Sequence, residues 1–116
     1  MRKDHFRDKV LELLADLRGL DCEALYSGYG IRCDKTLFAI VSNSRLYFRV
    51  NDDTRPIYQA ARSSPLLTRG GVYEKDFMEV PPAVLRDAAL AVEWAATSIS
   101  GARETKRGRK RKVRIR

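Results

Sequence analysis

The sequence predicts an α+β domain in which helices cover an antiparallel sheet. The first observation is a run over residues 25–50 that reads as three short strands joined by two tight polar turns. The second is a pair of helical patterns, one near each end of the chain, that bracket this run. Because a small sheet is stable only when one face is covered, we expect the helices to pack on it.

An amphipathic helix is predicted over residues 4–18. Its apolar residues recur at helical spacing and form a single stripe made by Phe6, Val10, Leu13, Leu14 and Leu17. Asp4 can cap the start of this helix because its carboxylate accepts backbone N–H bonds, and Gly19 is a natural stop. We expect the stripe to pack on the sheet.

Three strands follow, over residues 26–32, 37–41 and 46–50. Gly28 and Gly30 share one face of the first strand, where glycine is unfavourable unless something approaches closely. Packing of another element over the bare backbone and the approach of a phosphate or other ligand both account for them. Since the stretch lacks the G-x-G-x-x-G pattern of dinucleotide-binding loops, packing is the favoured interpretation.

The second strand is apolar on both faces, whereas a strand covered on one side only should alternate. Phe38 and Ile40 share a face, and Tyr47 of the next strand can join them in one apolar patch. An exposed patch of this kind marks a partner-binding surface. The alternative is that a loop or the C-terminal segment covers it, and the sequence favours neither.

The middle of the chain predicts a short helix and two further strands. Asp53 or Thr54 can cap the helix, with Pro56 in its first turn. Strands are expected over residues 66–68 and 72–80, around a Gly-Gly turn.

The last predicted element is a helix over residues 82–100, opened by Pro82. Its apolar stripe consists of Leu85, Ala88, Val92, Ala95 and Ile99. Gly101 is its natural stop.

The charge of the chain is concentrated at its C-terminal end. The net charge is +8, from 23 basic and 15 acidic residues. Residues 103–116 hold nine of the bases and one of the acids, which leaves 14 of each sign in residues 1–102. We therefore divide the chain into a neutral domain, residues 1–102, and a basic tail, residues 103–116.

The basic tail is the strongest chemical signal in the sequence. Clustered Lys and Arg neutralise phosphates and release counterions, so the tail predicts contact with nucleic acid. The predicted contact residues are Lys106, Arg107, Arg109, Lys110, Arg111, Lys112, Arg114 and Arg116. The alternatives are a disordered solubilising tail and a short edge strand at Val113 and Ile115. The tail has no aromatic residue on which single-stranded bases could stack.

The sequence offers little for catalysis, metals or cofactors. Cys22 and Cys33 lack C-x-x-C spacing, and with His5 they are too few for a zinc site, so we expect reduced thiols. The adjacent Asp52 and Asp53 fit a turn. No apolar run of about 18 residues is present and the N-terminus has no signal-peptide pattern, so we expect a cytoplasmic protein that does not enter a membrane.

The chain resembles the TfoX/Sxy N-terminal domain family of bacterial competence regulators over roughly residues 6–100. The motifs that carry the resemblance are SGYGI at 27–31, LFAIV at 37–41, RLYFRV at 45–50, FMEVP at 77–81 and EWA at 93–95. The first glycine motif departs from the pattern, with Tyr26-Ser27 in place of Phe-Gly. The basic tail stands where full-length regulators of the family carry a helical C-terminal domain.

The resemblance implies a two-layer α+β fold, with an antiparallel five-strand sheet and helices packed on it as in secretion chaperones. It also implies a regulatory or binding module, such as a co-regulator of transcription that acts with other proteins. It supplies no catalytic residue, cofactor or ligand.

Two hypotheses of function follow. The first is a DNA-associated regulatory module whose domain holds a protein partner or a second copy and whose tail anchors it to nucleic acid. The second is a protein-interaction or chaperone-like module that binds through Phe38, Ile40 and Tyr47, with the tail incidental. A small-molecule enzyme ranks below both.

Overall fold

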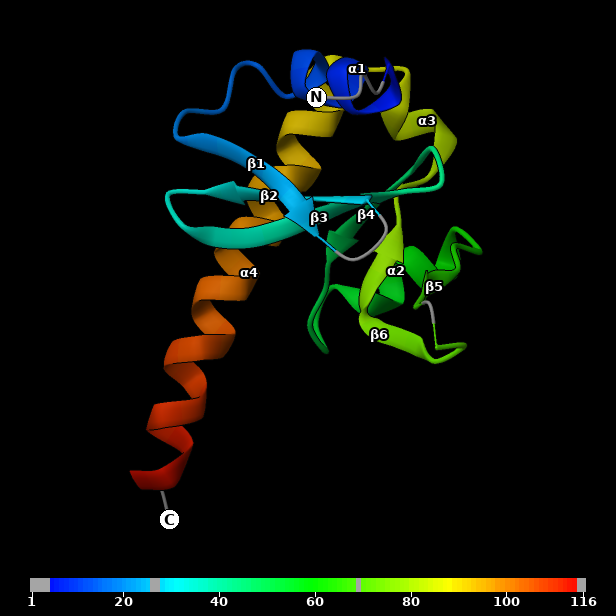
Figure 1. Ribbon diagram of the computed structural model, residues 1–116. Coiled ribbons are helices and arrows are strands. Elements are labelled where there is room, and N and C mark those ends of the chain that lie inside the picture. The colour runs from blue at the N-terminus through cyan, green and yellow to red at the C-terminus, as the bar shows by residue number, and fades with distance from the viewer. Residues whose placement is uncertain (1–4, 26–27, 69, 115–116) are drawn as a thin grey trace.

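The structure is a computed structural model that describes residues 5–25, 28–68 and 70–114, and describes side chains as far as residue 104. A six-stranded antiparallel sheet forms one layer, and the helices pack against one of its faces (Figure 1). The strands are β1 (Leu20–Leu25), β2 (Gly28–Cys33), β3 (Thr36–Ser42), β4 (Arg45–Arg49), β5 (Pro65–Leu67) and β6 (Tyr73–Glu79). Their order across the sheet is β1-β2-β3-β4-β6-β5.

The predicted α+β architecture is confirmed, but the sheet has six strands and not five. The five expected strands correspond to β2–β6, and the one that sequence reasoning missed is β1. This edge strand pairs with β2 along its whole length, from Leu20 opposite Cys33 to Leu25 opposite Gly28. Its side chains are exposed or only partly buried, and the alternation of Leu20 and Cys22 with Asp21 and Glu23 was the signal that could have marked it.

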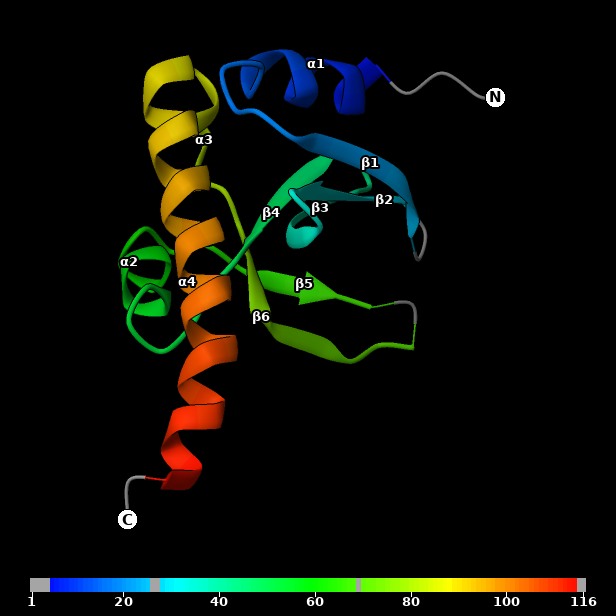
Figure 2. The ribbon, with the colours of Figure 1, turned by 90° about the vertical axis from the view of Figure 1, so that its left-hand side faces the viewer.

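Four helices lie on the covered face: α1 (His5–Leu13), α2 (Arg55–Ala60), α3 (Pro82–Leu85) and α4 (Ala88–Arg114). α1 ends at Leu13, earlier than the predicted residue 18. Beyond it the chain forms turns, in one of which the Leu17 N–H donates to the Leu14 carbonyl at 2.9 Å. α2 begins after Thr54 with Pro56 in its first turn, as predicted, but the Thr54 side chain makes no capping bond to the helix and instead accepts the Asn51 N–H at 2.9 Å. Figure 2 shows α4 running along the sheet with α1 across one end.

The prediction of a single helix over residues 82–100 is wrong in two respects. The segment is divided into α3 and α4, and α4 continues beyond residue 100. Asp87 interrupts the segment, because its carboxylate accepts the Leu90 N–H at 3.1 Å and so caps a new helix. Gly101 does not stop it either. A Cβ on Gly101 would lie 2.9 Å from Asn51 Nδ2, so the glycine serves a close approach between α4 and the loop before α2, and the helix continues through it.

The main core lies between the helices and the sheet. Its largest fully buried side chains include Phe38, Phe48 and Leu14. Arg7 of α1 also lies over the ring of Tyr29 on β2, 4.6 Å from its centroid, which ties the helix to the sheet.

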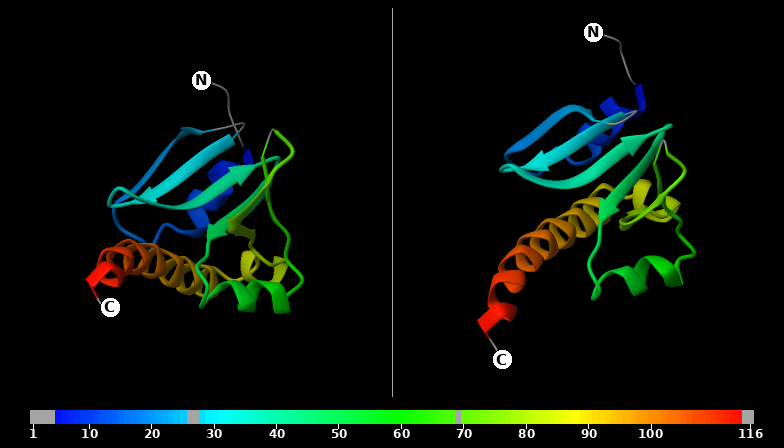
Figure 3. Two further views of the ribbon diagram at one scale, coloured as in Figure 1. Left: turned by 90° about the horizontal axis from the view of Figure 1, so that it is seen from below. Right: turned by 60° about the horizontal axis from the view of Figure 1, so that its bottom comes forward.

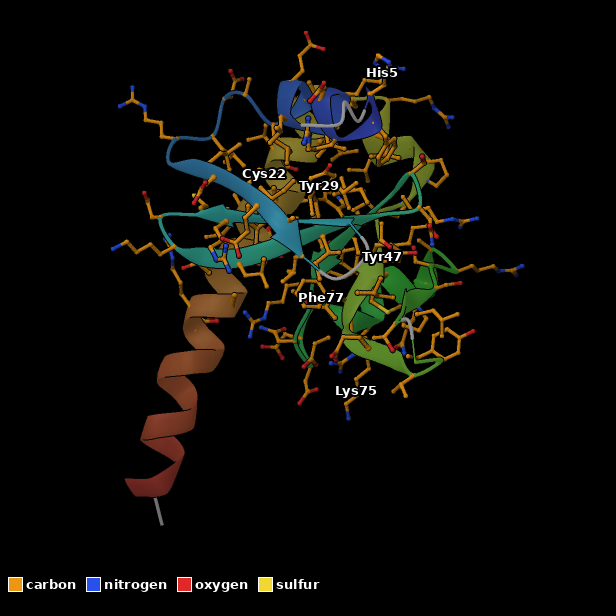
Figure 4. The ribbon with its side chains drawn as sticks, viewed as in Figure 1. His5, Cys22, Tyr29, Tyr47, Lys75 and Phe77 are labelled. Carbon is orange, nitrogen blue, oxygen red and sulfur yellow. The ribbon has the colours of Figure 1, made fainter. Side chains whose placement is uncertain are left out.

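A second, smaller buried cluster lies on the opposite face of the sheet. It consists of Ile40, Tyr47, Leu66 and Phe77, with Leu25 and Leu37 packed against it. The sheet bends so strongly that the β5–β6 hairpin stands at a steep angle to β2 and β3 (Figure 3). The sheet therefore closes this face with its own side chains, including Tyr47 and Phe77 (Figure 4).

The predicted exposed patch of Phe38, Ile40 and Tyr47 is wrong. Their exposed fractions are 0%, 2% and 8%, and they do not share a face. β3 carries a bulge, because Ile31 pairs with Ala39 while the next residue of β2, Arg32, pairs with residue 37. Phe38 is thereby left out of the register and packs in the main core beside Phe48, with ring centroids 5.8 Å apart.

The two glycines of β2 serve close packing. A Cβ on Gly30 would lie 2.7 Å from Leu25 Cδ2 and 3.1 Å from Leu37 Cδ1, which belong to the second cluster. A Cβ on Gly28 would collide with the Val41 carbonyl of the neighbouring strand. The favoured interpretation of close approach is confirmed, although strand groups and not a helix backbone make the approach.

Candidate nucleic-acid interface

The first half of α4, residues 88–102, is held on the sheet by burial. The side chains that face the core are Ala91, Ala95, Ile99 and Ala102. Ser98 adds a polar link, because its hydroxyl donates to the Arg49 carbonyl at 2.7 Å and lies 3.3 Å from the carbonyl of the bulge residue Phe38. These contacts set the position of α4 before the basic residues begin.

The second half of α4 carries the basic tail. The helix continues without a break from residue 103 to Arg114, a length of roughly 18 Å at 1.5 Å per residue. It leaves the domain as a projecting rod (Figures 1 and 2). We call residues 103–114 the basic arm.

Seven of the predicted contact residues lie on the basic arm, namely Lys106, Arg107, Arg109, Lys110, Arg111, Lys112 and Arg114. Arg116 lies outside the described residues, as does Ile115 of the alternative edge strand. Positions up to Arg114 are helical, so the strand alternative is wrong for Val113. Contact with nucleic acid itself stays a prediction.

Arg103, the first residue of the basic arm, is bound to the β2–β3 turn. Its Nη2 donates to the Cys33 carbonyl at 3.2 Å, and its Nε donates to Thr36 Oγ1 at 3.3 Å. Asp34 Oδ2 lies 3.9 Å from Nη2. A planar guanidinium suits this arrangement, because its fixed fork of donors reaches several acceptors at once.

The β2–β3 turn places a second cation beside Arg103. Asp34 and Lys35 adopt left-handed backbone conformations, with φ of 47° and 72°. Such a two-residue turn favours glycine or asparagine, and each other residue costs about 1 kcal/mol or more. Lys35 is exposed at the tip, and the Asp34 N–H donates to the Gly19 carbonyl at 3.0 Å, which ties the turn to the loop after α1.

Sequence reasoning missed that Arg103 binds the β2–β3 turn and that Lys35 lies exposed in that turn. Arg103 was counted in the tail but not among its contact residues, and its partners lie 67 and 70 residues away in the chain. For Lys35 a signal was present, because lysine stands in a two-residue turn where glycine is expected.

Much of the charge in the domain is paired locally. Arg55 binds Asp52 at 2.8 Å and Asp76 at 3.3 Å, and Arg32 binds Glu23 at 2.7 Å. These pairs agree with the neutral count for residues 1–102, so the excess of positive charge lies in the last 14 residues.

The cysteines, the histidine and the carboxylates of the described residues form no metal site. Cys33 is buried and its thiol donates to the Arg18 carbonyl at 3.2 Å, and neither Cys33 nor Cys22 forms a disulfide. His5 is exposed at the start of α1. In the described part of the chain, no group of three His, Cys, Asp or Glu residues could hold a metal ion.

The buried tyrosines are inert at neutral pH. Burial raises the pKa of Tyr47, and Glu79 raises it further. Burial also raises the pKa of Tyr58, which packs edge-on against Trp94 with ring centroids 4.9 Å apart. Both phenols therefore keep their protons and offer neither base nor nucleophile.

Comparison with protein families identifies the domain that carries the arm. A model of the TfoX N-terminal domain matches residues 12–102. The chain belongs to the TfoX N-terminal domain family. The resemblance seen in the sequence is thus confirmed, and the match ends immediately before the basic arm.

The TfoX N-terminal domain family is not known as an enzyme family. The comparison with curated proteins returned no match. None of the helices in the described part of the chain combines the length and apolar character needed to cross a membrane.

Proposed function

We propose that this chain is a non-enzymatic regulatory module of the bacterial cytoplasm that contacts nucleic acid through its basic arm. The observation that carries the proposal is the separation of charge. A neutral domain of the TfoX N-terminal family holds one end of α4, and the other end bears nearly all of the excess positive charge. The family supports a role in regulating competence or transcription alongside other proteins.

The chemistry of the arm favours contact with phosphates. Lys and Arg neutralise phosphate charge and release condensed counterions, which gives affinity without dependence on base sequence. If about six cations of the arm meet DNA phosphates, the logarithm of the binding constant falls with the logarithm of salt concentration at a slope near −5.

The test is a titration of the full chain with duplex DNA at several salt concentrations. We expect binding that weakens steeply with salt. Replacing the seven arm residues Lys106, Arg107, Arg109, Lys110, Arg111, Lys112 and Arg114 by glutamine should abolish it. A truncated chain of residues 1–102 should behave likewise, provided that its circular dichroism shows a folded domain.

Either of two results would contradict the proposal. Binding that survives glutamine replacement, or no salt-sensitive binding by the full chain at 0.1 M salt, removes the arm from the function. The protein-interaction hypothesis based on Phe38, Ile40 and Tyr47 is not a substitute, because these side chains are buried in the monomer.

A further inference from the structure

We propose that Lys35 is a second phosphate contact, and that Arg103 positions the basic arm relative to it so that both engage one DNA duplex. This inference rests on the proposed function and names its partner as double-stranded DNA. Counting charges places the whole DNA interface in the tail. The contact at Lys35 would make the domain itself part of that interface.

Lys35 lies in the chain between Asp34 and Thr36, the two residues of the turn whose side chains the Arg103 guanidinium approaches. The Arg103 guanidinium binds Thr36 Oγ1 at 3.3 Å on one side of Lys35 and lies 3.9 Å from Asp34 Oδ2 on the other. The basic arm therefore starts at the turn whose tip presents Lys35 to solvent. A phosphate backbone bound along the arm passes this tip.

The backbone of Lys35 adopts the conformation that a two-residue hairpin turn requires. Its φ of 72° lies in the left-handed region, where glycine is free of strain and lysine is not. Asp34 and the two residues of the β3–β4 turn, Asn43 and Ser44, share this conformation, so an exposed cation and not the backbone distinguishes Lys35. The exposed ammonium of Lys35 is the group that glycine would lack.

The shape of the arm favours a duplex over a single strand. An α-helix with its side chains is about 10–12 Å across, and the major groove of B-DNA is about 12 Å wide. The arm is helical through Arg114 and contains no aromatic residue for stacking on single-stranded bases. An arm held at a constant angle by Arg103 fits a stiff duplex, whose phosphates lie at regular intervals.

The first experiment measures the role of Lys35 in the full chain. Lys35→Gln removes one phosphate contact, so the salt slope should become less steep by about 0.9 and the affinity at 0.1 M salt should fall about eightfold. Lys75→Gln is the matched control, since this exposed lysine of β6 lies away from the β2–β3 turn (Figure 4). Equal effects of both variants would overturn the proposal.

Lys35→Gly separates binding from folding. Glycine relieves the left-handed strain, so the melting temperature should rise while DNA affinity falls as in Lys35→Gln. A fall in affinity accompanied by a lower melting temperature would mean damage to the turn, and unchanged affinity would mean no phosphate contact. Either result contradicts the proposal.

The second experiment tests the positioning role of Arg103 through a double-mutant cycle. Arg103→Lys keeps the charge but loses the fork that reaches Thr36 and Cys33 together. It should lower affinity several-fold when Lys35 is present and have no further effect in the Lys35→Gln background. Arg86→Lys, at an exposed arginine after α3, is the control. Additive losses would overturn the positioning role.

The failure of this inference differs from the failure of the proposed function. Without salt-sensitive binding by the unmodified chain, the proposed function itself falls before any variant of Lys35 is compared. With such binding but equal affinity for a 20-base single strand and its duplex, the arm is a general polyanion binder and the duplex inference falls alone.

Discussion

The two halves of α4 share one secondary structure but owe their stability to different causes. Residues 88–102 carry the buried alanines and Ile99 that pack on the sheet. Residues 103–114 carry like charges four residues apart, such as Lys106 with Lys110 and Arg107 with Arg111, which destabilise a helix. Burial supports the first half, whereas the second half projects from the domain beyond the contacts of Arg103 with the β2–β3 turn. The difference teaches that burial can hold one end of a helix while uncompensated like charge weakens the other end.

The largest expected effect lies in the buried interior of the domain, in contrast to the projecting half of α4. Ile40→Asp places an unpaired carboxylate in the second cluster, where Ile40 is 2% exposed, and should cost roughly 3–5 kcal/mol of the free energy of unfolding. Ile57→Asp, at a residue 51% exposed on α2, is the control and should change it by less than about 1 kcal/mol. Urea denaturation followed by the fluorescence of Trp94 measures both. A stable Ile40→Asp variant would restore the exposed-patch interpretation.

Alkaline pH should act where α2 packs against the first half of α4, because Tyr58 of α2 lies edge-on to Trp94. The pKa of Tyr58 is higher in the folded chain than its usual value near 10, because burial favours the neutral phenol. The contribution of Tyr58 to the free energy of unfolding is therefore fully present below pH 10. It decreases as pH rises above 10, by up to about 1.4 kcal/mol per pH unit. Tyr58→Phe should flatten this decline in denaturation curves recorded from pH 8 to 11. A decline as steep as that of the unmodified chain would show that Tyr58 is not its source.

The smallest effects compare one glycine from each half of α4. Gly101→Ala should lower the melting temperature, because the new Cβ meets Asn51 Nδ2 and the Asn51 Oδ1 already accepts the Asp53 and Thr54 N–H groups. Gly108→Ala should instead raise helix content, since alanine favours a helix interior by about 1 kcal/mol. Circular dichroism at 222 nm, with and without duplex DNA, records both. The same sign of change in the two variants would break the distinction between the halves.

Much of the sheet was predictable because it follows from local patterns. The polar turns at residues 33–36 and 42–45 and the alternation of β4 locate three strands within a residue or two. The arrangement of the buried faces was not predictable, because side chains alternate with a period of two and one extra residue reverses them. Phe38 is the extra residue of the bulge in β3, and no local sequence signal marks it.

The candidate site was predictable in its charge but not in its geometry. Counting Lys and Arg locates the tail, since charge is a property of composition. The contacts of Arg103 with Cys33 and Thr36 join segments far apart in the chain, so they exist only once α4 has packed on the sheet. The role assigned to Lys35 depends on the same contacts.

By itself, the sequence determined the α+β class, the five strands β2–β6, the family and the concentration of charge in residues 103–116. These features depend on the order of residues over short stretches. Tertiary structure alone decided that β1 pairs at the edge, that Ile40 and Tyr47 are buried, and that α4 continues through Gly101. The physical reason is that each of these outcomes depends on which distant group lies against a residue, and only the packed chain brings those groups together.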